Sequence, residues 1–87
     1  MALDGFIELE HGKYITLDLH GMSVQDAYGE LIYAINNLDA NCGSILVVHG
    51  FNLGTTLKNY IRNQFVHSAV VEKINIDAGR TLLKIKK

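Results

Sequence analysis

The chain has 87 residues, of which 48% are hydrophobic and 20% charged, and its formal net charge is −1. This length indicates one domain, and this composition excludes a disordered chain. A near-zero net charge does not by itself favour nucleic acid, which binds proteins largely through Lys and Arg. All the basic residues except Lys13 nevertheless follow residue 57.

No targeting or membrane segment is visible. The first residues lack a basic region followed by an apolar stretch, and no apolar run approaches the roughly 18 residues of a membrane span. The single Cys42 cannot form an internal disulfide, so nothing indicates an oxidising compartment. We expect a cytoplasmic protein that does not enter a membrane.

Two strands are predicted at the start of the chain, over residues 6–10 and 14–19, because apolar and polar residues alternate in both. His11 and Gly12 form the predicted hairpin turn between them. In the second strand one face carries apolar residues and the other carries Thr16 and Asp18, followed by His20. The apolar, core-facing residues are Ile15, Leu17 and Leu19.

A helix follows, with Ser23 as its N-cap and Asp26 completing a capping-box-like pair. Its apolar stripe consists of Val24, Ala27, Tyr28, Leu31, Ile32, Ile35 and Leu38. A glycine stop near residues 41–43 is expected to end the helix.

The continuous aliphatic run over residues 44–48 predicts a central parallel strand, buried on both faces. Thr55 or Thr56 caps a second predicted helix whose apolar residues are Leu57, Tyr60, Ile61 and Phe65. Two last strands, over residues 70–76 and 81–85, are joined by a hairpin at residues 77–80. The order is β-β-α-β-α-β-β. It predicts an α/β two-layer sandwich with a mixed sheet and both helices on one face.

The predicted strand ends bring three polar residues to one rim. Asp18 and His20 are two residues apart on one face, and His49 follows the central strand. A carboxylate beside an imidazole holds a general base in one tautomer or shares a metal ion. The structural alternative is a local hydrogen-bond scaffold around the Gly21 turn. No Cys/His spacing predicts a zinc site.

The string from His49 to Gly54 has two interpretations. Its glycines and the following helix start would suit a phosphate, or they form only a tight strand-to-helix turn. Phe51 in this loop would stack on a base or pack into a core or dimer contact. Lys58 and Arg62, four apart on the second helix, would contact phosphates or line a solvated face.

Together these strings resemble the small MutS-related (Smr) domain. Leu17-Asp18-Leu19-His20-Gly21 matches the family's first motif, and residues 23–27 continue it with the expected helix start. His49-Gly50-Phe51-Asn52-Leu53-Gly54-Thr55 is similar to the His-Gly-x-x-x-Gly-Thr form of the second motif. The resemblance covers about residues 14–87 of a single domain, 1–87, leaving 1–13 as an N-terminal strand and turn.

The resemblance implies a fold like the C-terminal domain of translation initiation factor 3. It also implies nucleic-acid binding and, in several members, endonuclease activity on DNA or RNA. Asp18 and His20 match the residues linked to cleavage, and the loop from His49 to Gly54 matches the part linked to nucleic-acid contact. Two departures stand out. The loop interior has no Lys or Arg, and only residues 77–79 stand in for the Gly-rich segment of many members.

The hypothesis is therefore a nucleic-acid-binding domain that nicks DNA or RNA. Asp18 orients His20 or holds a divalent metal such as Mg²⁺, His20 is base or ligand, and His49 is a second acid or phosphate ligand. The expected nucleic-acid-binding residues are His49, Gly50, Phe51, Asn52, Gly54, Thr55, Lys58 and Arg62. The alternatives are a binding module without chemistry and a protein-interaction domain. The choice between DNA and RNA, the metal requirement, and a homodimer or larger assembly stay open.

Overall fold

A computed structural model describes residues 12–39, 41–50 and 55–86. The elements in these ranges are β1 (Tyr14–Asp18), α2 (Val24–Asn36), β2 (Ser44–Val48), α3 (Thr55–Asn59), the π-helical turn η1 (Tyr60–Gln64), β3 (Val70–Asp77) and β4 (Arg80–Ile85). The predicted first strand, residues 6–10, and His11 of its turn lie outside the described residues. The observed order is therefore β-α-β-α-β-β, without the first strand of the predicted order.

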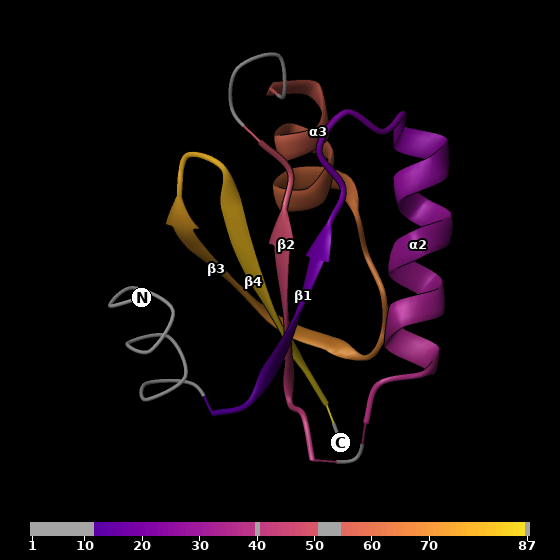
Figure 1. Ribbon diagram of the computed structural model, residues 1–87, viewed down its shortest axis with the longest axis vertical. Coiled ribbons are helices and arrows are strands. Elements are labelled where there is room, and N and C mark those ends of the chain that lie inside the picture. The colour runs from indigo at the N-terminus through magenta and orange to yellow at the C-terminus, as the bar shows by residue number, and fades with distance from the viewer. Residues whose placement is uncertain (1–11, 40, 51–54, 87) are drawn as a thin grey trace.

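The strands form one mixed sheet in the order β1-β2-β4-β3, as Figure 1 shows. β1 and β2 are parallel, whereas β4 runs antiparallel to both β2 and β3. β3 is consequently parallel to β2, and the crossover between them passes through α3 and η1. The α/β class and the mixed sheet predicted from the sequence are confirmed.

The helices and one face of the sheet share a single core. Leu31 of α2, Leu57 of α3 and Ile61 of η1 pack with the sheet residues Ile45 and Leu83 in one buried cluster. Both helices therefore cover the same face, as predicted. None of the described helices is long and apolar enough to span a membrane.

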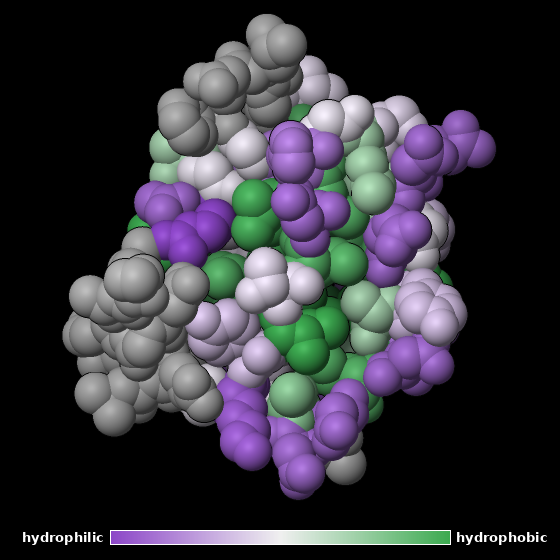
Figure 2. Space-filling view, viewed as in Figure 1, coloured by the Kyte–Doolittle hydropathy of each residue, from purple (hydrophilic) through white to green (hydrophobic). Residues whose placement is uncertain are grey.

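The opposite face of the sheet also buries apolar residues. Leu46 and Leu82, at 2% and 0% exposure, pack there with Tyr14, Ile74 and Ile76. Figure 2 shows apolar side chains gathered over the middle of the molecule, with polar ones towards its edges. β2 is thus buried on both faces, which confirms its predicted central place.

Helix α2 begins as predicted and ends earlier. The Ser23 hydroxyl accepts the Asp26 backbone N–H at 3.1 Å. The helix ends at Asn36, because the Asn37 backbone N–H and side-chain amide both donate to the carbonyl oxygen of Tyr33. The predicted stop near residues 41–43 is wrong, since Gly43 instead bonds to the backbones of neighbouring strands. Tyr28, placed in the apolar stripe, is half exposed.

The second helix has the predicted buried residues and an unpredicted shape. Leu57, Ile61 and Phe65 are buried. Beyond Asn59 the coil widens into η1, whose last turn closes with the Phe65 N–H donating to the Tyr60 carbonyl oxygen at 2.7 Å. Such i→i+5 turns are rare, and apolar spacing does not distinguish them from an α-helix.

Candidate active site

Asp18 and His20 form a hydrogen-bonded pair where β1 ends. The His20 backbone N–H and the ring Nδ1 both lie against Asp18 Oδ1, at 3.1 and 2.5 Å. A carboxylate only accepts, so the imidazole proton is on Nδ1 and the Nε2 lone pair is left for another partner. The side chains are 68% (His20) and 55% (Asp18) exposed. The sequence prediction that the two share an exposed face is confirmed.

The hydrogen bonds from His20 lower the pKa of Asp18, with the side-chain bond contributing most. Asp18 is therefore ionised at neutral pH and keeps the His20 ring oriented. The turn beyond it supports this arrangement. Met22 N–H donates to the Leu19 carbonyl oxygen at 3.0 Å, and Gly21 takes a φ of 81°, a conformation that favours glycine.

His49 follows β2 and lies beneath the surface, at 1% exposure. Its Nδ1–H donates to the Gly50 carbonyl oxygen at 3.1 Å, and its Nε2 lies 2.9 Å from Thr81 Oγ1. The Thr81 oxygen already accepts Arg62 Nε–H, so the Thr81 hydroxyl donates to His49 Nε2. The expectation that His49 lies on a solvent-facing rim is wrong, because both ring nitrogens are bonded within the protein.

Burial is the main reason that the pKa of His49 is lowered, and the charges of Arg62 and Lys58 lower it further. The hydrogen bond to Gly50 raises this pKa but does not reverse the shift. His49 is therefore a neutral imidazole at neutral pH. A buried, neutral ring with two partners is a structural group in this arrangement.

Gly50 brings the second motif against the first. Its φ is 78°, and a Cβ at this position would lie 3.3 Å from Cβ of His20. The Leu19 N–H donates to the Val48 carbonyl oxygen at 2.8 Å, which extends the contact between β1 and β2. The predicted convergence of the two motifs at neighbouring parallel strand ends is confirmed.

The backbone amides at the start of the second motif are already bonded. The N–H groups of His49 and Gly50 both donate to the Gly79 carbonyl oxygen, at 2.9 and 3.1 Å. These two amides do not point at an open anion site, contrary to the sequence hypothesis. Phe51, Asn52 and Gly54 lie outside the described residues. Thr55 opens α3, and its side chain is likewise outside them.

Of the two predicted helix cations, Arg62 is turned into the protein. Its Nη2 donates to the carbonyl oxygens of Asp77 and Arg80, at 2.6 and 3.0 Å, in addition to its bond with Thr81. It does not line a solvated helix face as expected. Lys58 is half-buried, and its charge acts on His49 as that of Arg62 does.

The model of the Smr domain family matches residues 17–80. The chain belongs to the Smr domain family. Smr domains are associated with nucleic-acid binding and with nicking endonuclease activity. Comparison with curated proteins and with solved structures gives no match in either set.

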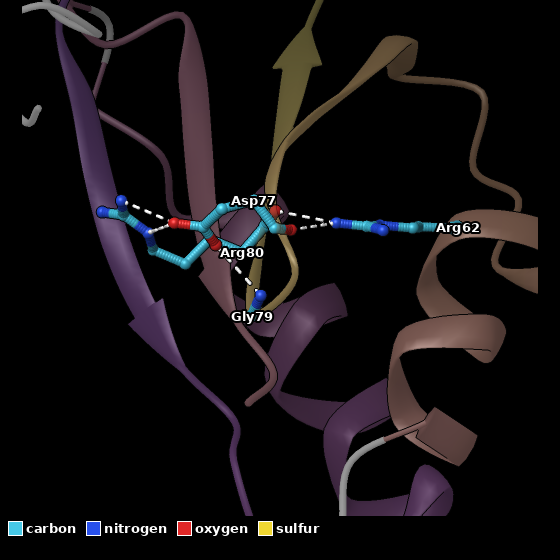
Figure 3. A network of polar contacts seen from close by, with 4 residues as sticks. All are labelled: Arg62, Asp77, Gly79 and Arg80. Carbon is cyan, nitrogen blue, oxygen red and sulfur yellow. Dashed lines mark hydrogen bonds and ion pairs between the residues drawn. The ribbon is translucent and has the colours of Figure 1, made fainter. Parts of the chain in front are cut away.

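The turn between β3 and β4 also bonds to the second motif, although the sequence analysis did not include this turn in the site. Asp77 accepts the Gly79 N–H on Oδ1 and two Arg80 side-chain N–H groups on Oδ2 (Figure 3). The ion pair lowers the pKa of Asp77. The Asp-Ala-Gly sequence signalled a hairpin turn, but nothing in it indicated that this turn holds the second motif.

This turn lines a recess beside the end of β2. In the sheet register Asp18 lies opposite Val48, and Val48 lies opposite Arg80, so the three residues share one face of the sheet. A hollow of about 370 Å³ lies beside Val48, a size within the usual range for ligand sites. Its described lining residues are Val48, Gly50, Asp77, Ala78, Gly79 and Arg80.

The described part of the Smr domain does not build a metal centre. It contains no group of three or more His, Cys, Asp or Glu side chains placed to hold an ion. Asp18 and His20 supply one carboxylate and one imidazole, and Asp18 Oδ1 already accepts two hydrogen bonds. This donor set does not fit a metal held by protein ligands alone.

Proposed function

We propose that this Smr domain binds nucleic acid at the exposed rim of the sheet and nicks a phosphodiester bond there. His20 is the general base and Asp18 orients it. The observation that carries this proposal is the short bond between His20 Nδ1 and Asp18 Oδ1 in an exposed pair. It leaves Nε2 as the acceptor for a substrate proton.

The chemistry of the pair follows from its geometry. Nε2 of His20 takes the proton from the attacking oxygen, either water or the 2′-hydroxyl of RNA. That oxygen forms a new bond to phosphorus, and the bond from phosphorus to the leaving oxygen breaks. The leaving oxygen takes its proton from solvent. The ionised Asp18 stabilises the imidazolium that forms, and general-base catalysis of this kind contributes roughly 10²–10⁴ in rate.

In the proposed arrangement, His49 and Gly50 hold parts of the site in place. The buried His49 ring is bonded to Thr81 and Gly50, and Gly50 lies against His20. We therefore assign His49 to holding the second motif in place, in contrast to the acid or phosphate ligand expected from the sequence.

The test is nicking of supercoiled plasmid DNA and of a labelled structured RNA. It compares wild type with His20→Ala, each in Mg²⁺ and in EDTA. We expect the variant to cut at least about 100-fold more slowly while binding the same substrates equally well. His67→Gln is the matched control, because His67 lies in the loop before β3, where its ring accepts the Ala69 N–H and stacks on Phe65, and it has no part in the proposed chemistry. Equal cutting by wild type and His20→Ala would overturn the catalytic role.

Binding without cleavage is the second candidate function. The observation that favours it is that His49, the expected second acid, is buried and has both ring nitrogens bonded within the protein. In that case wild type binds nucleic acid, with an affinity that falls steeply as salt rises, and cuts neither substrate. Absence of salt-dependent binding to either nucleic acid would favour the protein-interaction alternative.

A further inference from the structure

Arg62 joins the second helical segment to the turn between β3 and β4. Figure 3 shows its guanidinium approaching the turn from the side opposite the Arg80 guanidinium. Nε and Nη2 of Arg62 together reach three oxygens of the strand and turn: Thr81 Oγ1 and the carbonyl oxygens of Asp77 and Arg80. The flat guanidinium donates in a fixed fork, so these bonds fix the turn in one orientation relative to η1.

The turn held by Arg62 carries the second motif. Its Gly79 carbonyl oxygen accepts the N–H groups of both His49 and Gly50. The Asp77 carboxylate stiffens the turn by accepting the Gly79 N–H and the Arg80 side chain. A shift of the turn would therefore move Gly50 with it.

Gly50 in turn limits where His20 lies. A Cβ at position 50 would lie 3.3 Å from Cβ of His20, so the Gly50 backbone lies near the start of the His20 side chain. The connection thus starts with the bonds from Arg62 to the carbonyl oxygens of Asp77 and Arg80 and follows the backbone of the turn to Gly79. From Gly79 it passes by hydrogen bond to Gly50, which lies beside His20.

We propose that Arg62 is a positioning residue that holds His20 in its working orientation through the β3–β4 turn and Gly50. This rests on the proposed function in one respect, the role of His20 as base. It replaces the expectation that Arg62 contacts phosphates, because Nε and Nη2 of its guanidinium already donate to oxygens of the protein.

The discriminating variants are Arg62→Gln and Arg62→Lys, with Lys86→Gln, at an exposed position after β4, as the control for the loss of one positive charge. The first measurement is the salt dependence of binding to a single-stranded oligonucleotide. A residue that contacts a phosphate contributes about one to the slope of log affinity against log salt. We expect Arg62→Gln to leave this slope unchanged.

The second measurement is hydrogen exchange of the His49 and Gly50 amides, together with the NMR signals of the His20 ring nitrogens. We expect exchange of both amides to accelerate at least about tenfold in Arg62→Gln, and the His20 signals to shift. Arg62→Lys keeps the charge without the fork, so it is expected to resemble Arg62→Gln. Lys86→Gln should leave both readouts at their wild-type values.

Activity supplies the third readout. If wild type nicks, Arg62→Gln and Arg62→Lys should lower kcat by roughly 10–100-fold with little change in KM, because the base is misplaced while the binding surface remains. A wild type that does not nick would refute the proposed function alone. The exchange and NMR measurements would still decide the positioning role, since they require no turnover.

The positioning role is overturned if Arg62→Gln lowers the salt slope by about one, Arg62→Lys restores it, and amide exchange is unchanged. Should Arg62→Gln fail to fold, Arg62→Lys decides the question by the same exchange measurement. If the His49 and Gly50 amides of a folded Arg62→Lys exchange as slowly as in wild type, the guanidinium fork is not needed to hold the turn, and the proposal is overturned.

Discussion

Gly50 and His20 lie so close that a Cβ at position 50 would come within 3.3 Å of Cβ of His20. The two residues belong to different sequence motifs at the ends of the parallel strands β1 and β2. A side chain at position 50 would therefore require His20 to shift by a few tenths of an ångström.

Gly50→Ala is expected to destabilise the protein by about 1–2 kcal/mol, because φ is 78° there and a left-handed conformation strains other L-residues. The new methyl group should also displace His20 and slow nicking. Gly12→Ala separates the two effects, since φ is 82° there but nothing lies within 4 Å of its Cβ. Gly29→Ala, in open space on α2, should stabilise the protein by about 0.5–1 kcal/mol. Urea unfolding measures all three variants, and equal nicking by Gly50→Ala and Gly12→Ala would contradict the contact.

Asp18→Asn tests the orientation of the base. An amide is a weaker acceptor for the His20 Nδ1–H and no longer stabilises the imidazolium, so nicking should fall at least about tenfold. Binding should not weaken, because the change removes a negative charge that repels the phosphates at the exposed rim. Asp26→Asn, in the first turn of α2, is the control and should keep full activity. A rate in Asp18→Asn equal to wild type would show that the pair is structural.

The buried His49 predicts a stability that depends on pH. Its folded pKa is lowered from 6.5, so below pH 6.5 the unfolded state binds more protons than the folded state. The contribution of His49 to the free energy of unfolding is then complete above pH 6.5 and is lost as the pH falls. The total loss is about 1.4 kcal/mol for each pH unit by which folding lowers the pKa of His49. The pKa values of Asp18 and Asp77 are lowered from 3.8, so protonation of these carboxylates reduces stability only at a lower pH than protonation of His49 does.

Urea unfolding between pH 5 and pH 7.5 measures this effect of His49. His49→Gln retains an oxygen that can accept from Thr81 and does not titrate, so its stability should change much less over the same interval. An equally steep loss of stability in His49→Gln would assign the effect to another group.

Lys73 closes the C-terminal end of the π-helical turn. Its Nζ donates to the carbonyl oxygens of Ile61 and Phe65, at 2.8 and 2.5 Å, and burial lowers the pKa of this amine. Lys73→Met keeps the aliphatic stem but leaves both acceptors without this donor, so we expect a loss of about 1–3 kcal/mol in thermal or urea unfolding. Lys86→Met, at an exposed position after β4, should change stability by less than about 0.5 kcal/mol. Similar values for the two variants would show that Lys73 does not stabilise η1.

Local patterns in the sequence predicted much of this structure. Alternation placed Asp18 and His20 on the exposed face of β1, and the aliphatic run placed β2 at the centre of the sheet. The Ser23 cap and the buried residues of both helical segments also follow from spacing alone. These features were predictable because side-chain direction has a fixed period in a strand and in a helix.

Other features depend on partners that are distant in the sequence. Helix α2 ends where Asn37 bonds to the Tyr33 carbonyl oxygen, whereas the glycine at position 43 predicted a later end. The π-helical turn η1 has the same apolar spacing as an α-helix, so the sequence does not distinguish the two. His49 was expected at the surface because it follows a strand and precedes a glycine. In the folded chain its ring bonds to Thr81, which is 32 residues away. Burial lowers its pKa most, and the charges of Arg62 and Lys58 lower it further, so the ring is neutral.

The order of the described strands and helices, the two motifs and the exposed Asp18–His20 pair follow from short-range patterns of residue type. Only the folded chain decided which polar groups around them face water, because Thr81 and Gly79 bond to the second motif and Arg62 bonds to Thr81, all from separate elements. A hydrogen bond between distant residues leaves no periodic trace in the sequence, so the division between solvent-facing and internally bonded residues is a property of the tertiary structure.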